Sequence, residues 1–410
     1  MRQAVSRSIG ALRSVMGGPV LTPDDTGFDD RRRVWNAGID RRPAAIARCA
    51  SAADAAAAVR HAQEHDLEIS VRGGAHNTAG TAVCDGGLMI DLSLLNSVAV
   101  DPAAQRAKVD GGALLADLDA ATQAHGLAVP AGLISHTGVG GLTLGGGMGW
   151  LSREFGLSLD NLAAAEVATA DGRLQRASAA ENPELFWAIR GGGGNFGVVS
   201  SFEFQLHGID PVVQVGLFFW SLDQGPQALR LAGEITAAMP PGINAVIAAV
   251  NAPPAPFVPR RYHFAPGYAL LLTGFGATQE HDWLASRIRR AAPLSGAMFY
   301  RLDGAYSQVA DDETAFGGGR SPRYGAFIIG LALDADLLET ERSWVRGFWE
   351  ALRPHAIGSG DGYVNGTTDY REDRVRNSYG AAKYRRLAGI KAEYDPDNVF
   401  HLNANIRPAA

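Results

Sequence analysis

Only two cysteines, Cys49 and Cys84, occur among the 410 residues of this sequence. This count excludes a framework of disulfide bonds and a metal site built from thiolates, and it favours a reducing compartment. The net charge is −6, so the chain has no basic excess of the kind that indicates binding to nucleic acid or to an anionic membrane. We therefore expect a cytoplasmic protein that acts on small molecules.

Long apolar runs are also missing. No stretch approaches the roughly 20 apolar residues that a membrane-spanning helix needs. The basic N-terminal segment, residues 1–18, has no uninterrupted apolar core like that of a signal peptide. At 410 residues the chain is too long for one simple core, and we predict two domains.

The pattern of apolar residues predicts a mixed α/β layout up to residue 206, followed by an α+β region with an antiparallel sheet. Helices are expected over residues 42–68, 113–124, 224–238 and 339–352, with Ser51 as an N-cap and Gly126 after a helix end. Strands are expected over residues 67–71, 87–92, 97–100, 107–110, 202–206, 212–220, 270–274 and 326–330. The last stretch, residues 384–408, is polar and does not resemble a helix.

Glycine is abundant, at 50 residues, and much of it gathers in three loops. We name them the first glycine loop (residues 73–75, which includes Ala75), the second (138–147) and the third (191–197). Glycine leaves consecutive amide N–H groups accessible, and such nests bind phosphate oxygens. Three loops of this kind predict a large cofactor that carries phosphate groups.

The residues around the glycine loops exclude two common nucleotide sites. No loop is followed by Lys and then Ser or Thr, as in a P-loop NTPase. The first loop is also not followed by a helix of the Rossmann type with an acidic residue about 20 positions on, which a nicotinamide site needs. His76 lacks nearby carboxylate or histidine partners, so we expect no metal there. It is either an ordinary histidine or a nucleophile that bonds to a methyl carbon of a cofactor ring.

These motifs together resemble the flavin-linked oxidases of the vanillyl-alcohol oxidase superfamily, and more closely the berberine bridge enzyme-like branch. The similarity covers about residues 40–208 and 384–408, and its specific segments are residues 71–77, 90–93, 138–147, 156–157, 160–162, 184–197, 394–400 and 403–406. The resemblance implies a two-domain α+β fold. Residues 1–208 would form a PCMH-type FAD-binding domain, residues 209–383 a substrate domain with an antiparallel sheet, and residues 384–410 a segment that returns to the FAD domain.

The resemblance implies one FAD, with its pyrophosphate on residues 72–77 and a single covalent link from His76 to the flavin 8α-methyl group. Many relatives have a second link from a cysteine, but Ile134 stands at that position here. The residues that we expect to bind FAD are Arg72, Gly73, Gly74, Ala75, His76, Asn77, Gly80, Gly132, Thr137, Gly138, Gly141, Gly145, Gly146, Asn161, Val167, Gly197, Val199, Asn403 and Asn405.

Two residues are expected to be catalytic. Tyr363 matches the tyrosine of the family's Tyr-x-Asn strand and is our candidate for the base, although a tyrosine packed in a sheet is the alternative. Gly366 stands where the family commonly has an aromatic residue. Asn403 and Asn405 match the family's closing Asn-x-Asn, with Asn405 at the active site. They could instead satisfy backbone groups in an irregular tail.

The resemblance implies an oxidase that transfers hydride from a CH–OH or CH–NH group, in a sugar or secondary metabolite, to FAD and then reduces O₂ to H₂O₂. Thr137 matches the position that controls oxygen access, and its size favours an oxidase over a dehydrogenase. We expect His136 to be structural, or else to stabilise the reduced flavin. Arg320 is expected near the substrate or on the surface. The alternatives are oxidative cyclisation or C–C bond formation in natural-product biosynthesis, and a flavin-binding protein without redox activity.

Overall fold

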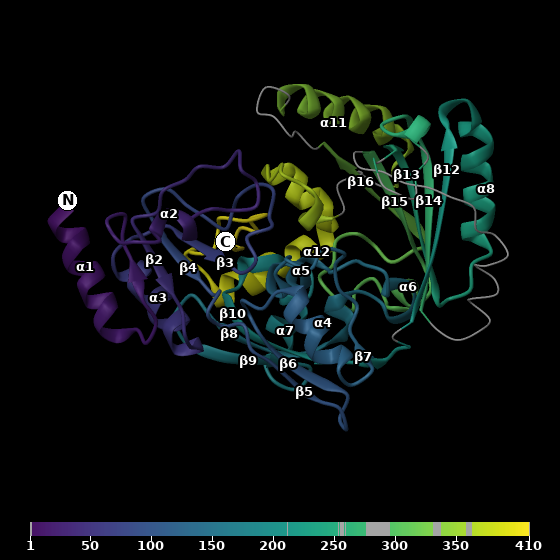
Figure 1. Cartoon of the computed structure of the whole chain (residues 1–410). Helices are drawn as coiled ribbons and strands as arrows, with labels where there is room; N and C mark the ends of the chain where they lie inside the picture. Colours follow the sequence, from purple (N-terminus) through teal and green to yellow (C-terminus); the bar gives the residue numbers. More distant parts are fainter. Residues whose placement is uncertain are drawn as a thin grey trace.

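The computed structural model describes residues 2–210, 212–252, 254, 258, 260–275, 296–330, 338–357 and 363–409. The described part of the chain contains four β-sheets. Figure 1 shows the sheets of the N-terminal half on one side of the molecule and the sheet of β12 to β16 on the other, with the C-terminal helix α12 between them. No helix within the described residues is long and apolar enough to cross a membrane.

The first sheet carries the first glycine loop. Its order is β1 (Val20–Leu21), β2 (Ala45–Arg48), β4 (Leu88–Asp91) and β3 (Ile69–Arg72), and the last three strands are parallel. Strands β3 and β4 end in register at Arg72 and Asp91, so the first glycine loop leaves the sheet at this edge.

The helix predicted over residues 42–68 is too long. Residues Ala45–Arg48 form strand β2, and helix α3 (Ala52–Glu64) begins only after Ser51, whose side chain accepts a hydrogen bond from the Asp54 amide. The N-cap therefore sets the start of this helix, as expected. Alanines of α3 and Val59 pack in a core with the first sheet. Two further helices precede this unit, α1 (Arg2–Val15), which packs on α3, and α2 (Phe28–Arg31).

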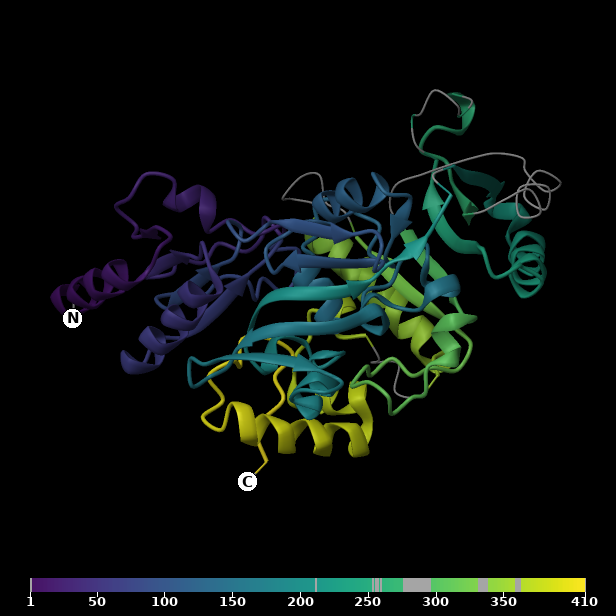
Figure 2. The ribbon, with the colours of Figure 1, turned by 90° about the horizontal axis from the view of Figure 1, so that it is seen from below.

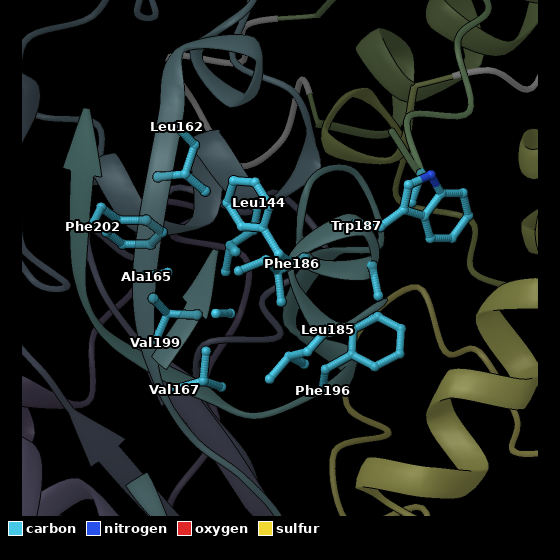
Figure 3. Packing of buried hydrophobic residues seen from close by; sticks show 14 of the residues in the cluster. Leu144, Leu162, Ala165, Val167, Leu185, Phe186, Trp187, Phe196, Val199 and Phe202 are labelled. Carbon is cyan, nitrogen blue, oxygen red and sulfur yellow. The ribbon is translucent and has the colours of Figure 1, made fainter. Parts of the chain in front are cut away.

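The second sheet is antiparallel, in the order β5 (Val98–Asp101), β6 (Arg106–Asp110), β10 (Val198–Gln205), β8 (Leu162–Ala168) and β9 (Leu174–Ser178). Figure 3 shows Phe202 and Val199 of β10 packed with Leu144, Leu185 and Phe186. Leu144 comes from helix α5 (Val139–Gly145), and Leu185 and Phe186 come from helix α7 (Pro183–Ile189). The remaining α-helices and strands of this half are α4 (Leu115–Gln123), α6 (Ser152–Phe155) and the strand pair β7 (Leu127–Ala128) and β11 (His207–Gly208).

The sheet beyond residue 208 is antiparallel, as the sequence predicts. Its order is β12 (Val213–Ser221), β14 (Pro266–Phe275), β13 (Ile243–Asn251), β15 (Gly296–Leu302) and β16 (Arg323–Ile329). Helix α8 (Gly225–Ala237) covers one face, where Ile235 shares a core with Ile243 of β13. The next residue, Asn244, points to the other face and donates to the carbonyl oxygens of Gly149 and Trp150. That face is therefore turned toward the N-terminal half. Two further helices complete this part of the chain: α11 (Leu338–Leu352) contacts β16, and α10 (Ala305–Gln308) packs against α6.

The expectation of a non-helical C-terminal segment from residue 384 is wrong in part. Helix α12 (Glu372–Tyr394) continues to Tyr394, with a kink at Gly380, and only the residues after it are irregular. Its second half is rich in Ala, Lys and Arg, which favour helix, and it buries Leu387 and Ile390. The helix packs against α7, so the chain returns to the N-terminal half (Figure 2). The predicted boundary between residues 383 and 384 lies inside this helix.

Candidate active site

A cavity of about 340 Å³ lies where the three glycine loops meet the C-terminal segment. This volume is within the range of about 300–1,000 Å³ that is typical of ligand sites. Its wall includes residues from the first sheet, from the second sheet and from the stretch after α12. Expected cofactor-binding residues in this wall are Gly73, Gly74, Ala75, His76, Asn77, Thr137, Gly138, Gly141, Gly197, Val199 and Asn403.

The first two glycine loops touch through their backbones. A Cβ atom added to Gly138 would clash with the backbone nitrogen of Gly74, and a Cβ atom on Gly74 would clash with the backbone of Gly138. Neither glycine has a positive φ, so close approach is the reason for glycine at both positions. Gly141, also in the wall, has nothing within 4 Å of its Cβ position and leaves room for a ligand.

This contact gives a first prediction. Gly138→Ala should overpack the loop contact at a cost of about 1–3 kcal/mol. Because both glycines line the cavity, we expect FAD binding to become about 10- to 100-fold weaker. The measurement is a titration with FAD of FAD-free protein that carries His76→Ala in every variant, so that FAD binding is reversible. Gly233→Ala in α8, where nothing lies within 4 Å of the added methyl group, is the matched control. Equal affinity in the Gly138→Ala variant and the control would contradict the role of the contact.

The third glycine loop is joined to the C-terminal segment by Asn195, which is 1% exposed. Its Nδ2 donates to the carbonyl oxygens of Gly192 and Ala404, and its Oδ1 accepts a hydrogen bond of 2.9 Å from the amide of Ile406. Gly192 and Ala404 also line the cavity, so Asn195 holds two distant parts of the cavity wall together. The sequence motif contains this residue, but its type alone did not indicate this role.

His76 lies in the wall at the end of the first glycine loop, directly after Ala75, which has a positive φ of 55°. Burial, and to a smaller extent the neighbouring His136, lowers the pKa of His76 below its usual 6.5. The imidazole is therefore neutral at neutral pH, which is the form that can act as a nucleophile. The next residue, Asn77, donates a hydrogen bond of 2.8 Å to the Tyr370 hydroxyl group.

Tyr363 stands beside the cavity, at the start of a 3₁₀ turn (Val364–Gly366) and not in a strand. Its hydroxyl oxygen accepts hydrogen bonds from the Gly147 amide at 3.3 Å and from Asn365 Nδ2 at 3.4 Å. Asn365 itself lines the cavity. Burial raises the pKa of Tyr363, whereas these donors favour the phenolate and oppose the rise.

The remaining expected residues lie outside the cavity wall. Arg72 directs its guanidinium toward buried Asp91 and the Arg33 carbonyl, and Asn161 bonds to the backbone and to His207. Gly80 adjoins Ile39, and Val167 is part of the core of the second sheet. The full set outside the wall is Arg72, Gly80, Gly132, Gly145, Gly146, Asn161, Val167, Asn405 and the catalytic candidate Tyr363. Ile134 is also outside it and is 49% exposed.

Arg320 is not a surface residue. It is 5% exposed and binds Asp160 through two hydrogen bonds, of 2.7 and 2.6 Å. Because Asp160 also caps the Leu157 amide, this ion pair stabilises the turn before β8. Within the described residues, no group of three or more His, Cys, Asp or Glu side chains is arranged to hold a metal ion.

Besides the glycine loops, unpaired polar atoms of the protein suit the cavity to a cofactor such as FAD. The side-chain oxygens of Asn403 and Asn405 are buried without a hydrogen-bond partner. Asn403 lines the cavity, and a ligand with donor groups would satisfy an oxygen there. The sequence motifs assigned no role in the site to several other residues of the wall: Asn195, Asn365, Tyr370, Tyr379, Phe400 and Leu402.

Comparison with known proteins identifies the class of cofactor. The FAD binding domain model matches residues 43–178, and the model described as berberine and berberine like matches residues 362–407. The chain is 33% identical to (R)-6-hydroxynicotine oxidase of Paenarthrobacter nicotinovorans, over 95% of this chain and 97% of that protein. It is 40% identical over 186 residues to glucooligosaccharide oxidase of Sarocladium strictum, which covers 44% of this chain and 37% of that protein.

Solved structures share the whole fold. The crystal structure of 6-hydroxy-D-nicotine oxidase from Arthrobacter nicotinovorans superposes with a TM-score of 0.80 and 28% identity, over 96% of this chain and 98% of that one. The BBE-like 1 protein of Physcomitrella patens has a TM-score of 0.83 and 22% identity, over 98% and 99%. The predicted two-domain α+β fold of the PCMH type is confirmed.

The fold and the site therefore define an FAD-dependent oxidoreductase. The chain belongs to the FAD-linked oxidases of the berberine bridge enzyme-like family.

Proposed function

We propose that this enzyme oxidises a CH–OH or CH–NH group of a small organic molecule, such as a sugar or a secondary metabolite. FAD linked covalently to His76 would accept the hydride, and O₂ would then be reduced to H₂O₂. One observation carries the proposal: His76 and all three glycine loops line a single cavity, beside Tyr363. The similar proteins named as oxidases of 6-hydroxynicotine and of glucooligosaccharides support the reaction class.

The chain's own residues provide binding and proton transfer around the cofactor. When bound, FAD supplies a ring system that accepts hydride. Tyr363 would accept the proton of the substrate's hydroxyl or amino group as the hydride leaves. The Gly147 amide and Asn365 then stabilise the phenolate, because both already donate to its oxygen. Asn405, with its unpaired buried oxygen, remains our second catalytic candidate.

A cluster of aromatic rings from the sheet beyond residue 208 lies next to Tyr363. Phe327 of β16 meets Tyr363 edge-on with ring centroids 5.9 Å apart, and Tyr300 of β15 meets Phe327 edge-on at 5.5 Å. A Cβ atom on Gly366 would lie 3.5 Å from the Phe327 ring, so Phe327 fills space beside the position where the family commonly has an aromatic residue. Aromatic rings of this kind suit a flat or apolar substrate face.

The direct test is anaerobic mixing of the purified enzyme with candidate alcohols, sugars and amines. We expect one class to bleach the flavin absorbance, and O₂ to restore it with one H₂O₂ formed per substrate. A product that is a simple carbonyl or imine supports the proposal, whereas a ring-closed product identifies oxidative cyclisation. Bleaching by no substrate would favour a flavin-binding protein without redox activity. Thr137, which lines the cavity, is our reason for expecting rapid reaction with O₂.

His76→Ala is expected to lose all covalent FAD but to retain part of the FAD non-covalently, because the glycine loops and Asn403 remain. The reduction potential and the turnover should both fall. Both are measured on the variant after reconstitution with FAD, with exposed His125→Ala as the control. Covalent FAD in the His76→Ala variant would show that another residue forms the link.

The proposal includes a cytoplasmic location. It rests on the low cysteine count, and both Cys49 and Cys84 are buried as free thiols.

A further inference from the structure

His76 does not stand alone in the cavity wall. Its Nε2 lies 2.5 Å from Nδ1 of His136, a residue 60 positions later, and the two ring centroids are 4.6 Å apart. His76 is half-buried, whereas His136 is exposed to solvent. The pair thus connects the cavity to water by one hydrogen bond.

Trp35 fixes the orientation of both imidazoles. Its ring stacks on His76 with centroids 4.8 Å apart and 13° between the planes, and its centroid is 4.6 Å from that of His136. The Trp35 amide donates to the carbonyl oxygen of Ala75, which anchors the indole to the first glycine loop. Trp35 is 58% exposed, so it contributes little to the core.

The chemistry of imidazole assigns a direction to the hydrogen bond. A neutral histidine has one N–H donor and one nitrogen with a free lone pair. If Nε2–H of His76 donates to Nδ1 of His136, the lone pair of His76 is on Nδ1, the nitrogen that is free to bond to carbon. The lowered pKa of His76 supports this neutral form.

We propose that His136 is the positioning residue and proton acceptor for covalent attachment of FAD to His76. The inference rests on the proposed link. In the overall step, a bond forms between His76 Nδ1 and the 8α carbon, while one C–H bond of the methyl group and the Nε2–H bond of His76 break. His136 accepts the proton from Nε2 and, being exposed, exchanges it with water. The two electrons and two protons released reduce O₂ to H₂O₂.

The reversed hydrogen bond then holds the product. Once Nδ1 of His76 is bonded to carbon, its Nε2 has a lone pair and no proton, so it accepts from Nδ1–H of His136. The same pair of atoms therefore stabilises both the nucleophile and the attached state. A histidine at position 136 can serve in both, because its Nδ1 either accepts or donates.

The test measures attachment and not turnover. Wild type, His136→Ala, His136→Asn and the control His125→Ala are synthesised in a cell-free system without FAD and then mixed with FAD and O₂. Samples are quenched in acid at intervals, and the mass of each protein gives the fraction that carries FAD. We expect attachment to be at least about 10²-fold slower in His136→Ala, as for loss of a general base. His136→Asn, which can accept the hydrogen bond but not the proton, should be intermediate.

Two further readouts separate this role from a structural one. Free imidazole should accelerate attachment in His136→Ala, because the vacated position is exposed, whereas a merely misfolded variant would not respond. Non-covalent FAD binding before the quench should stay within a few-fold of wild type. Attachment at the wild-type rate in His136→Ala, or no response to imidazole, would overturn the inference while leaving the His76 link intact. Release of all FAD from acid-quenched wild type would instead refute the link itself.

Discussion

Replacement of Lys391 by methionine is expected to lower the free energy of unfolding by about 3–5 kcal/mol. Lys391 and Asp395 are both fully buried, and their charged groups are 2.5 Å apart. Lys391 Nζ also donates to the carbonyl oxygens of Asn195 and Phe400. The methionine variant would leave the Asp395 carboxylate buried without its cation, and two carbonyl groups without a donor.

The effect should extend to the active site, because this lysine joins α12 to the third glycine loop and to Phe400, both in the cavity wall. The measurement is urea denaturation followed by circular dichroism. Arg376→Met is the matched control, since Arg376 and Glu372 form an ion pair with the same spacing on the same helix but are exposed. We expect it to cost about 1 kcal/mol or less. Equal losses in the two variants would contradict the importance of the buried pair.

Replacement of Tyr363 by phenylalanine is expected to lower kcat by about 10²- to 10⁴-fold, the usual contribution of a general base. The phenylalanine ring keeps the edge-on contact with Phe327, and FAD content should be unchanged. Tyr306→Phe is the control, because Tyr306 belongs to the same apolar cluster and its hydroxyl donates to the Gly319 carbonyl. Only the Tyr363 variant should lose rapid reduction of the flavin by substrate in stopped-flow measurements.

The pH dependence of catalysis tests the same role. Burial raises the pKa of Tyr363 above its usual 10, so the hydroxyl is protonated at neutral pH. The phenolate fraction therefore increases as the pH rises, and kcat/KM should increase with it on the alkaline side. This increase should disappear in Tyr363→Phe. A similar increase in both proteins, or a Tyr363→Phe variant with wild-type kcat, would show that another group takes the proton.

Much of the N-terminal half was predictable because its sequence signals are local. Gly73 and Gly74 follow an apolar strand, and such a loop can be recognised from residue types alone. That His76 lines the cavity also follows from its place at the end of that loop. The antiparallel sheet of the second half was predictable from apolar runs such as those of β14 and β16.

Contacts between distant segments were not predictable from the same signals. The pairing of His76 with His136, and the position of Trp35 on both, depend on how two loops and an N-terminal turn pack together. Strand β2 was assigned to a helix because its alanine-rich sequence continues into α3, and only its pairing with β4 makes it a strand. Similarly, the polar sequence of α12 hides the few residues that it buries, such as Leu387.

The central claim is that the cavity between the glycine loops holds FAD, tethered by His76 alone. The most direct test is to denature the wild-type protein in acid and to determine the mass of the proteolytic peptide that contains His76. We predict that this peptide gains the mass of one FAD and that no other peptide does. FAD that washes quantitatively from the denatured protein, or that stays on a different peptide, would contradict the claim.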